Sequence, residues 1–288
     1  VSEIDTKAMV AIGGGDPPDI AGVFSYNIPQ YAQSGAAIPL GSFGDDATRV
    51  RPEDYAPAVA GLLSYGGQLI AGISSLYSLA LYYNRSMYRD AGMNPDTPPQ
   101  TTVALDAAAD RLTIRNGRAI ERAGLLPNLP LWWPYFWPVM FGGRLYDPVL
   151  NRAEFDDAAA VRAYEWVAGY PSRLGMAASQ EFGNAYNRSF HSPQDPFISG
   201  RVAMIVQGPW LANFINRYNP GLDYGVAPVP VAAELVDPAN PYGLLEADVL
   251  IIPRGCRNPE AAFEFVRFTQ RQDVQEQLAR EHTKSSPL

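Results

Sequence analysis

The sequence predicts an α/β protein, and three observations lead to this fold class. Short apolar runs, several of them β-branched, alternate with amphipathic segments along all 288 residues, which is the pattern of strands and helices that follow one another in such a chain. Glycine and proline, 25 and 26 residues, are scattered between the runs, as expected for many short connections. The length fits two domains or one large domain.

The composition excludes several classes of protein. Hydrophobic residues make up 47% and charged residues 18% of the chain, which is typical of a folded protein and not of a disordered one. The net charge of −8 argues against a nucleic-acid partner, because binding to phosphates needs a basic surface. No apolar run approaches the roughly 18 residues that a membrane-spanning helix needs.

Cysteine and histidine are too scarce to build a reactive or metal-binding cluster. The single cysteine, Cys256, excludes an intramolecular disulfide and a cysteine-rich metal site. The two histidines, His191 and His282, lie far apart in the sequence, so we expect no metal site, no cofactor and no catalytic residue. The chain begins at Val1 without a methionine. We therefore expect a processed or truncated amino terminus, and a lipid anchor ahead of it is left open.

The first part of the chain predicts one helix and three strands. An amphipathic helix is expected over Ile4 to Ile12, and a short buried strand over Ile20 to Val23. The tetrapeptide FSYN, which holds Tyr26 and Asn27, follows this strand directly. Two further strands are predicted over Leu69–Ile73 and Leu79–Tyr83.

Capping residues mark where the later helices begin. A side-chain oxygen at the N-cap accepts a hydrogen bond from a free N–H group of the first turn, and proline fits the first helical position. Helices are therefore predicted after Asn84, from Thr101 or Thr102 to Leu112, after Asp156 and Asp157, and after Asn258, with another near Val274–Leu278. The expected apolar faces are Val161, Tyr164 and Val167 in one helix and Ala262, Phe263, Val266 and Phe268 in another, which follows a strand over Val249–Ile252.

The stretch from Phe197 to Phe214 predicts a strand that leads into a helix with an aromatic residue at the junction. Val202 to Val206 is an apolar run long enough for one buried strand. Gly208 ends it, and Pro209 suits the first helical position. Trp210 then projects from the carboxyl end of the strand, which is the edge where ligands bind in open α/β sheets. An ordinary core position for this ring is the alternative.

Four segments, in this order, resemble the extracellular solute-binding proteins of ATP-binding-cassette importers, in the branch of the maltodextrin-binding protein. They read GGGDPPDI, LALYYNRSMYRDAGM followed by PPQTT, FISGRVAMIVQGPW, and GCRNPEAAFEFVRFTQ. The resemblance covers nearly the whole chain, and the third segment is its most specific part. The family's opening strand and helix and its last helices have no counterpart here, and Val103 stands where the family usually has tryptophan.

The resemblance implies a two-lobed periplasmic-binding-protein fold of type II, in which two discontinuous α/β lobes joined by a hinge close on a ligand. Projected onto this sequence, lobe one holds residues 1–78 and 249–288 and lobe two holds residues 82–242. The hinge then crosses at residues 79–81 and 243–248. The implied protein is extracytoplasmic and monomeric, and it delivers a small-molecule ligand to the transmembrane subunits of an ABC permease.

The densest aromatic run, LWWPYFWPVMF over residues 131–141, is a candidate for contact with a sugar. So many large rings cannot all be buried in one small core without partners for their polar edges. At least two of the rings are expected to pack under a helix, and the others suit the C–H faces of sugar rings. The resemblance places this run on the lobe-two wall of the cleft.

A sugar also carries hydroxyl groups, so its site needs hydrogen-bonding side chains. Tyr26 and Asn27 suit this role by their position after a strand, and Tyr77 resembles a cleft position of the family. Glu246 and Asp248 at the second crossing are further acceptors, with hinge solvation or salt bridges as the alternative, and Glu181 is a weaker candidate. The full set of expected ligand-binding residues is Tyr26, Asn27, Tyr77, Trp132, Trp133, Tyr135, Trp137, Trp210, Glu246 and Asp248.

The sequence therefore predicts the substrate-binding component of an ABC importer, which binds a sugar or oligosaccharide without a covalent or catalytic step. A binder of another solute, such as a glycerophosphodiester or a polyamine, is the alternative. Arg144 could contact an anion, although a surface position is expected for it. A carbohydrate-active enzyme is a further alternative, but it needs two carboxyl groups facing one bond, and no nucleophile elbow or phosphate loop is present.

Overall fold

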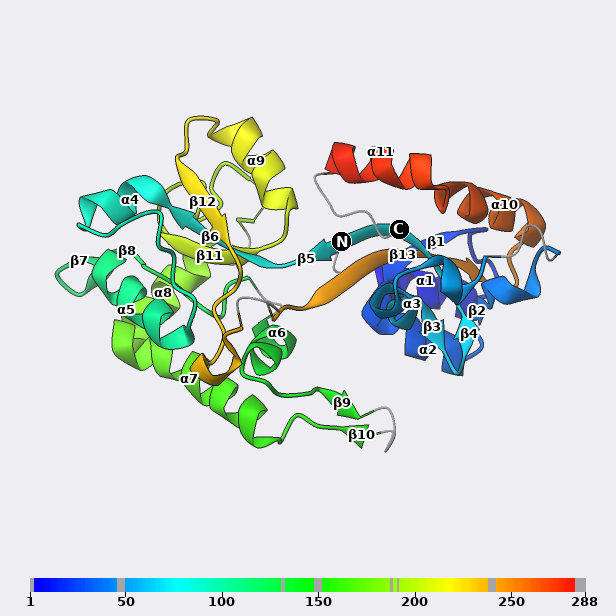
Figure 1. Cartoon of the computed structure of the whole chain (residues 1–288), viewed down its shortest axis with the longest axis horizontal. Helices are drawn as coiled ribbons and strands as arrows, with labels where there is room; N and C mark the ends of the chain where they lie inside the picture. Colours follow the sequence, from blue (N-terminus) through cyan, green and yellow to red (C-terminus); the bar gives the residue numbers. More distant parts are fainter. Residues whose placement is uncertain are drawn as a thin grey trace. The chain divides into compact units, whose positions relative to one another are not determined.

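The chain divides into two compact units, each described here by itself (Figure 1). The computed structural model describes residues 3–45, 50–130, 133–147, 152–186, 189–190, 192–237 and 242–282. Unit 1 joins residues Val1–Tyr77 to Leu245–Leu288, and unit 2 is the continuous segment Ser78–Leu244. Only unit 1 is thus discontinuous in sequence.

Unit 1 is built on a small sheet whose central strand comes from the carboxyl-terminal part of the chain. Strand β13 pairs with β1 and β2, both antiparallel to it, and with β5. In Figure 1 helices α10 and α11 lie on one side of β13, and α2 and α3 on the other. The elements are α1 (Ile4–Gly13), β1 (Ala21–Phe24), η1 (Ser25–Asn27), α2 (Ile28–Gln33), β2 (Ala37–Ile38), η2 (Leu40–Ser42), η3 (Pro52–Asp54), α3 (Pro57–Leu63), β3 (Ser64–Tyr65), β4 (Gln68–Leu69), β5 (Gly72–Ser78), β13 (Leu245–Pro253), α10 (Pro259–Thr269) and α11 (Gln272–His282).

The carboxyl-terminal helices are joined to β5 by the side-chain amides of Gln275, which is buried, and Gln270, which is half-buried. Oε1 of Gln270 accepts from the backbone N–H of Ile73 at 2.9 Å, and Nε2 of Gln275 donates to the carbonyl of Ile73 at 2.9 Å. A Cβ atom on Gly72 would lie 2.5 Å from Cγ1 of Val266, so α10 approaches the strand backbone where only glycine fits. The prediction of one strand over Leu69–Ile73 is wrong in its bounds, because β4 ends at Leu69 and β5 begins at Gly72.

Unit 2 has a three-stranded antiparallel sheet with β6 in the centre. Gln207 of β11 pairs with Ala80, and Ala227 of β12 pairs with Leu81. The two outer strands therefore end at the same edge of the sheet. The elements are β6 (Ala80–Asn84), α4 (Arg85–Asp90), α5 (Thr102–Leu112), β7 (Ile114–Asn116), β8 (Ala119–Arg122), α6 (Trp133–Met140), β9 (Tyr146–Asp147), β10 (Arg152–Ala153), α7 (Ala158–Leu174), α8 (Met176–Tyr186), β11 (Met204–Gln207), α9 (Trp210–Tyr218), β12 (Tyr224–Ala227) and η4 (Ala233–Leu235).

Three of the predicted helix caps in unit 2 are present. The side chain of Asn84 accepts from the N–H of Met87 at 2.9 Å, and Thr101 and Asp157 cap α5 and α7 in the same way. The expected face of α7 is partly wrong, since Val161 is 41% exposed. The core-facing residues of α7 are Ala160, Ala163, Val167, Tyr170 and Leu174.

The helix after Asn258 begins as expected but is not capped by that side chain. Nδ2 and the backbone N–H of Asn258 both donate to the Asp19 carboxylate, at 3.1 and 2.9 Å. Asn258 thus ties the start of α10 to the loop before β1 instead of closing its own helix. Phe268, which was expected on the apolar face of α10, is 49% exposed.

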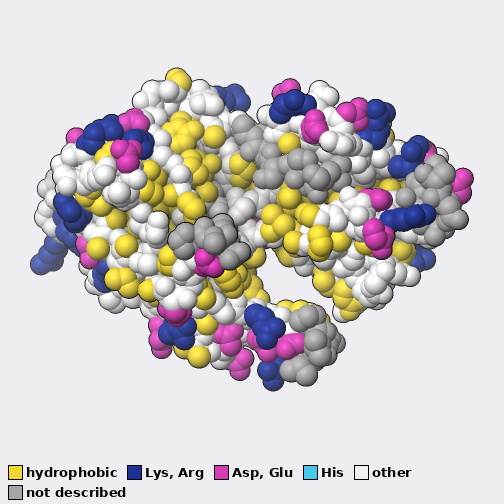
Figure 2. All heavy atoms as spheres, viewed as in Figure 1, with side chains coloured by type: hydrophobic (Ala, Val, Ile, Leu, Met, Phe, Trp, Pro, Cys, Tyr) yellow, Lys and Arg dark blue, Asp and Glu magenta, His cyan; other side chains and the backbone are white. Residues whose placement is uncertain are grey.

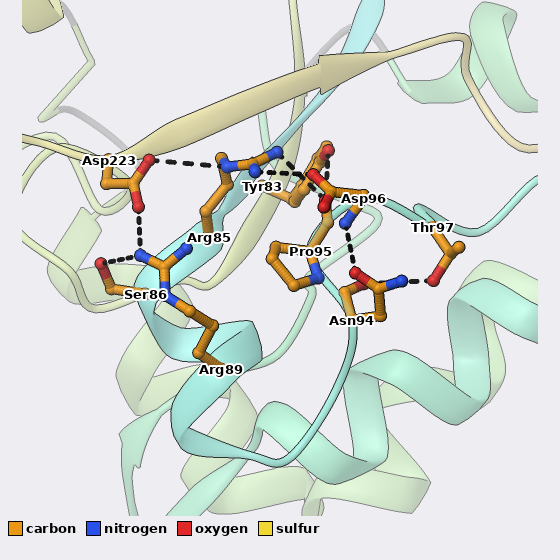
Figure 3. Close-up of polar contacts among 9 residues, drawn as sticks. All are labelled: Tyr83, Arg85, Ser86, Arg89, Asn94, Pro95, Asp96, Thr97 and Asp223. Atoms are coloured by element: carbon orange, nitrogen blue, oxygen red, sulfur yellow. Dashed lines mark hydrogen bonds and ion pairs between the residues drawn. The ribbon is translucent and has the colours of Figure 1, made fainter.

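An ion-pair network on the surface of unit 2 fixes the chain where β6 passes into α4 (Figure 3). Nη2 of Arg85 lies 2.7 Å from Oδ1 of Asp96, and its Nε lies 3.6 Å from Oδ1 of Asp223. Asp223 also pairs with Arg89. Nη1 of Arg85 donates to the carbonyl of Pro95 at 3.2 Å. These contacts surround the carboxyl end of β6, which lies opposite the edge at which β11 and β12 end because β6 is antiparallel to both strands.

Acidic and basic side chains are interspersed on the face shown in Figure 2. The sequence has 30 acidic and 22 basic residues. Ion pairs between arginine and acidic side chains occur in both units. None of the helices that the structure describes is long and apolar enough to cross a membrane.

Candidate functional site

The pairing of β1 with β13 brings three of the predicted residues of unit 1 together. Phe24 at the end of β1 lies opposite Asp248, so the residues after Phe24 run past the start of β13. Oγ of Ser25 accepts from the N–H of Ala247 at 3.2 Å, which continues the contact beyond the strand. Tyr26 therefore lies beside Glu246 and Asp248, which share one face of the strand because side chains alternate along it.

Tyr26 presents an accessible ring within an acidic environment. The side chain is 57% exposed, and its ring stacks on Phe24 with centroids 5.3 Å apart. Burial of the rest of the side chain is the main reason why the pKa of the Tyr26 phenol is raised. The negative charges of Asp5, Glu246 and Asp248 raise this pKa further. The phenol therefore stays protonated and can donate a hydrogen bond.

The two carboxylates of β13 differ in exposure. Glu246 is only 8% exposed, whereas Asp248 is half-buried and accepts from Oγ of Ser75 at 2.7 Å. Asn27 is half-buried at the end of η1, the short helix that also contains Tyr26. Tyr77 is buried on β5, but it is not among the residues of the unit 1 hydrophobic core. Unit 1 thus offers carboxylate acceptors beside a phenol.

In unit 2 the indole of Trp210 lies at the edge where β11 and β12 end. The ring is half-buried and packs against the hydrophobic core of the unit. Its Nε1–H donates to Oε1 of Gln207 at 3.0 Å, and a Cβ atom on Gly208 would lie 2.2 Å from its Cη2 and Cζ3 atoms. Helix α9 begins at Trp210, with Pro209 as the N-cap residue.

The aromatic run 131–141 is mostly a helix and not a loop, and much of it belongs to the core. Trp137 is 1% exposed, its Nε1–H donates to the carbonyl of Pro127 at 2.8 Å, and its ring meets Trp166 edge-on at 4.7 Å between centroids. Trp137 therefore has no accessible face for a sugar and is corrected to a packing residue. Tyr135 on α6 is half-buried. Trp132 and the side chain of Trp133 lie outside the described residues.

The weaker candidates lie on the surface of unit 2. Glu181 is exposed on α8 and lines a shallow hollow with Glu121 and Arg201. The side chain of Arg144 is 70% exposed, as expected for a surface residue, and its Nε lies 3.9 Å from Oε2 of Glu154. A mainly apolar pocket of about 340 Å³, lined by residues from 98–100, 227–231, 235–237 and by Tyr242, contains none of the predicted ligand residues.

Sequence reasoning missed three residues that support the candidate site. Asp5, Ser75 and Gln207 contact or influence Tyr26, Asp248 and Trp210. Gln207 had one local signal, since it is the polar residue that ends an apolar strand before Gly208. Asp5 and Ser75 are brought in by long-range packing. In the described part of the chain no group of three or more His, Cys, Asp and Glu side chains could hold a metal ion.

Comparison with known proteins places the chain. It is 23% identical to the maltotriose-binding protein of Pyrococcus abyssi over 96% of this chain and 56% of that protein. The mannobiose-bound structure of CpMnBP1 is 26% identical and has a TM-score of 0.87, over 98% of this chain and 69% of that one. The mannotriose-bound structure is 27% identical with a TM-score of 0.87, over 100% and 72%.

The chain spans between 56 and 62% of the length of the curated relatives it matches. The match to the family and the similarity to the fold of CpMnBP1 agree with the two-lobed α/β class that the resemblance implied. Residues 2–276 match the family model described as bacterial extracellular solute-binding protein. Because this match covers nearly the whole chain, the protein belongs to the bacterial extracellular solute-binding protein family.

Proposed function

We propose that this protein is the extracytoplasmic substrate-binding component of an ABC importer and that it binds a sugar or short oligosaccharide. The observation that carries the proposal is the set of groups around Tyr26, an accessible ring beside the carboxylates of Glu246 and Asp248. A sugar needs an aromatic face for its C–H groups and strong acceptors for its hydroxyl groups. The ligands for which the similar proteins are named, maltotriose, mannobiose and mannotriose, support the same class.

In this proposal both units contribute to the binding of one ligand. Unit 1 supplies Tyr26, Asn27, Glu246 and Asp248, with Tyr77 as a further candidate, and unit 2 supplies Trp210 and Tyr135. The chain passes between the units at Tyr77–Ser78 and Leu244–Leu245. We propose hinge crossings next to these points, at residues 79–81 and 243–248, so that residues 245–248 of the second crossing also begin β13 of unit 1. Ligand that contacts both units favours the closed form, which the permease then recognises.

The proposed role contains no catalytic step. Glycosidases place two carboxyl groups on either side of the bond that breaks, whereas Glu246 and Asp248 follow one another on one face of β13. A polyamine binder is the second candidate, because the three carboxylates that raise the pKa of Tyr26 suit a cationic ligand. An anionic glycerophosphodiester is disfavoured by the same carboxylates.

The test is calorimetric titration with mannobiose, mannotriose, maltotriose, spermidine and glycerophosphocholine, followed by analysis of each sugar for cleavage products. We expect saturable binding of at least one sugar and no product. Binding of spermidine alone would support the second candidate. Turnover of a sugar, or saturable binding of glycerophosphocholine without any sugar, would contradict the proposal.

A further inference from the structure

The indole of Trp210 is held by the residue that ends β11. Its Nε1–H donates to Oε1 of Gln207 at 3.0 Å, and Gln207 is fully buried. An indole nitrogen can only donate a hydrogen bond, so the amide oxygen of Gln207 has to face the ring. This contact fixes the orientation of the amide and turns its NH₂ group away from Trp210.

The NH₂ group of Gln207 has no acceptor in the part of the chain that the structure describes. Nε2 is buried and has no hydrogen-bond partner among the residues that the structure describes. A buried donor without an acceptor destabilises a fold, and an apolar side chain of similar size avoids that penalty. Since an apolar side chain would avoid this penalty but could not accept from the indole, the contact with Trp210 accounts for an amide at this position.

Two further contacts limit the movement of the ring. A Cβ atom on Gly208 would lie 2.2 Å from Cη2 and Cζ3 of Trp210, so the indole lies against the backbone of this glycine. The hydroxyl of Tyr82 donates to the carbonyl of Gly208 at 3.2 Å, which fixes that backbone in turn. The indole is thus constrained both at its N–H edge and on one side of the ring.

We propose that Gln207 is a positioning residue for ligand binding, which sets the orientation of Trp210 before the ligand arrives. The inference rests on the proposed function, in which a sugar contacts the indole. A side chain that becomes immobile on binding loses conformational freedom, and this loss weakens association. A ring already held by Gln207 loses less freedom, so the ligand binds more tightly.

The test is the variant Gln207→Met, which removes the amide and keeps an unbranched side chain. The probe is whichever of mannobiose, mannotriose and maltotriose binds the wild type most tightly. We expect its Kd to rise about five-fold, while the Tm stays at or above the wild-type value. A purely structural role predicts the reverse, a lower Tm with an unchanged Kd.

Two further variants isolate the indole contact. Trp210→Phe keeps an aromatic face but has no N–H, so adding Gln207→Met to it should not raise the Kd further. The indole signal that is missing from the ¹H–¹⁵N spectrum of Trp210→Phe belongs to Trp210. We expect this N–H to exchange faster with water in Gln207→Met, where its acceptor is removed. Tyr88→Phe is the matched control, because it deletes a buried contact to Sδ of Met204 on the same strand and should leave the Kd unchanged.

The outcomes separate this inference from the proposed function. An unchanged Kd in Gln207→Met, in a protein whose binding Trp210→Ala weakens, overturns the inference and leaves the proposed function in place. A five-fold rise in Kd when Gln207→Met is added to Trp210→Phe also overturns the inference, because Gln207 would then affect binding without its hydrogen bond to the indole. If no sugar binds, or if Trp210→Ala binds as well as wild type, the proposed site fails and the inference fails with it.

Discussion

The two units present different chemistry where their candidate ligand residues lie. In unit 1 an exposed phenol lies beside carboxylates on β13, and in unit 2 a half-buried indole is held by a buried amide. Carboxylates and hydroxyls give directional hydrogen bonds, whereas an immobile aromatic ring gives a flat apolar face. We propose from this difference a division of work, in which unit 1 selects the hydroxyl pattern of the ligand and unit 2 provides stacking.

The largest effect is expected for Trp210→Ala. Loss of a stacking aromatic residue at the centre of a site typically costs about 2 kcal/mol, which is roughly a 30-fold rise in Kd. Calorimetry with the tightest-binding sugar measures this change, and circular dichroism checks that the variant is folded. Trp210→Phe keeps a ring and should lose less. Equal losses in both variants would show that the affinity depends on the N–H group that donates to Gln207 and not on the presence of an aromatic ring face.

A smaller effect is expected for Asp248→Asn in unit 1. The amide keeps the shape of the side chain but replaces a charged acceptor, so we expect about a ten-fold rise in Kd for a sugar. The matched control is Asp273→Asn, an exposed carboxylate of unit 1 that pairs with Arg271. A loss of similar size in this control would assign the effect to the net charge and not to the site.

Asp248→Asn has a second readout that needs no ligand. Removing the negative charge near Tyr26 makes its phenolate easier to form, so the pKa of Tyr26 should fall from its raised value. Ultraviolet titration of the phenolate, with Tyr26→Phe subtracted, measures this pKa. An unchanged pKa would mean that Asp248 does not influence the ring and that the acidic environment comes from Asp5 and Glu246.

Tyr26→Ala should weaken sugar binding less than either variant, by about two- to five-fold. More than half of the side chain remains exposed, so a ligand covers only part of its surface, and a partly covered ring contributes about 0.5–1 kcal/mol. Tyr146→Ala is the control, because Tyr146 is 47% exposed on a hairpin of unit 2 that we do not place at the site. A larger loss in Tyr26→Ala than in Trp210→Ala would reverse the proposed division of work.

The parts of this structure that the sequence predicted depend on residues close together in the chain. Asn84 caps α4 through Met87, three residues away, and Thr101 caps α5 through Ala104. Such contacts follow from local sequence, because the side chain reaches only the next turn. The fold class was predicted for a related reason, since strands and helices alternate at short intervals and the four family segments are continuous stretches.

The parts that the sequence did not predict depend on partners far away in the chain. Asn258 binds Asp19, 239 residues before it, and Ser75 binds Asp248 across 173 residues. Trp137 and Trp210 look alike in sequence, because each follows or precedes proline in an apolar stretch. Their burial differs because Trp166 and Pro127 close over Trp137, and no local pattern contains that information.

The units also differ in how their helices begin, and this predicts the smallest effect. In unit 1 the N-cap residues of α1, α2, α3 and α10 make no side-chain cap bond, whereas in unit 2 Asp157 accepts from the N–H of Ala160 at 2.7 Å. Burial alone would raise the pKa of Asp157, but backbone N–H groups of Ala160 and Arg144 outweigh it and lower the pKa below 3.8. The carboxylate is therefore stabilised in the folded state.

Asp157→Ala should lower the free energy of unfolding by about 1 kcal/mol near neutral pH and leave sugar affinity unchanged. Because the folded-state pKa of Asp157 lies below its ordinary value of 3.8, the charged cap contributes fully above pH 3.8 and its contribution is lost as the pH falls through the folded-state pKa. The Tm difference between wild type and variant should therefore shrink in acid. Asp156→Ala, the exposed neighbour, is the control. A Tm difference that stays constant down to the lowest pH would mean that the cap stabilises α7 without its charge.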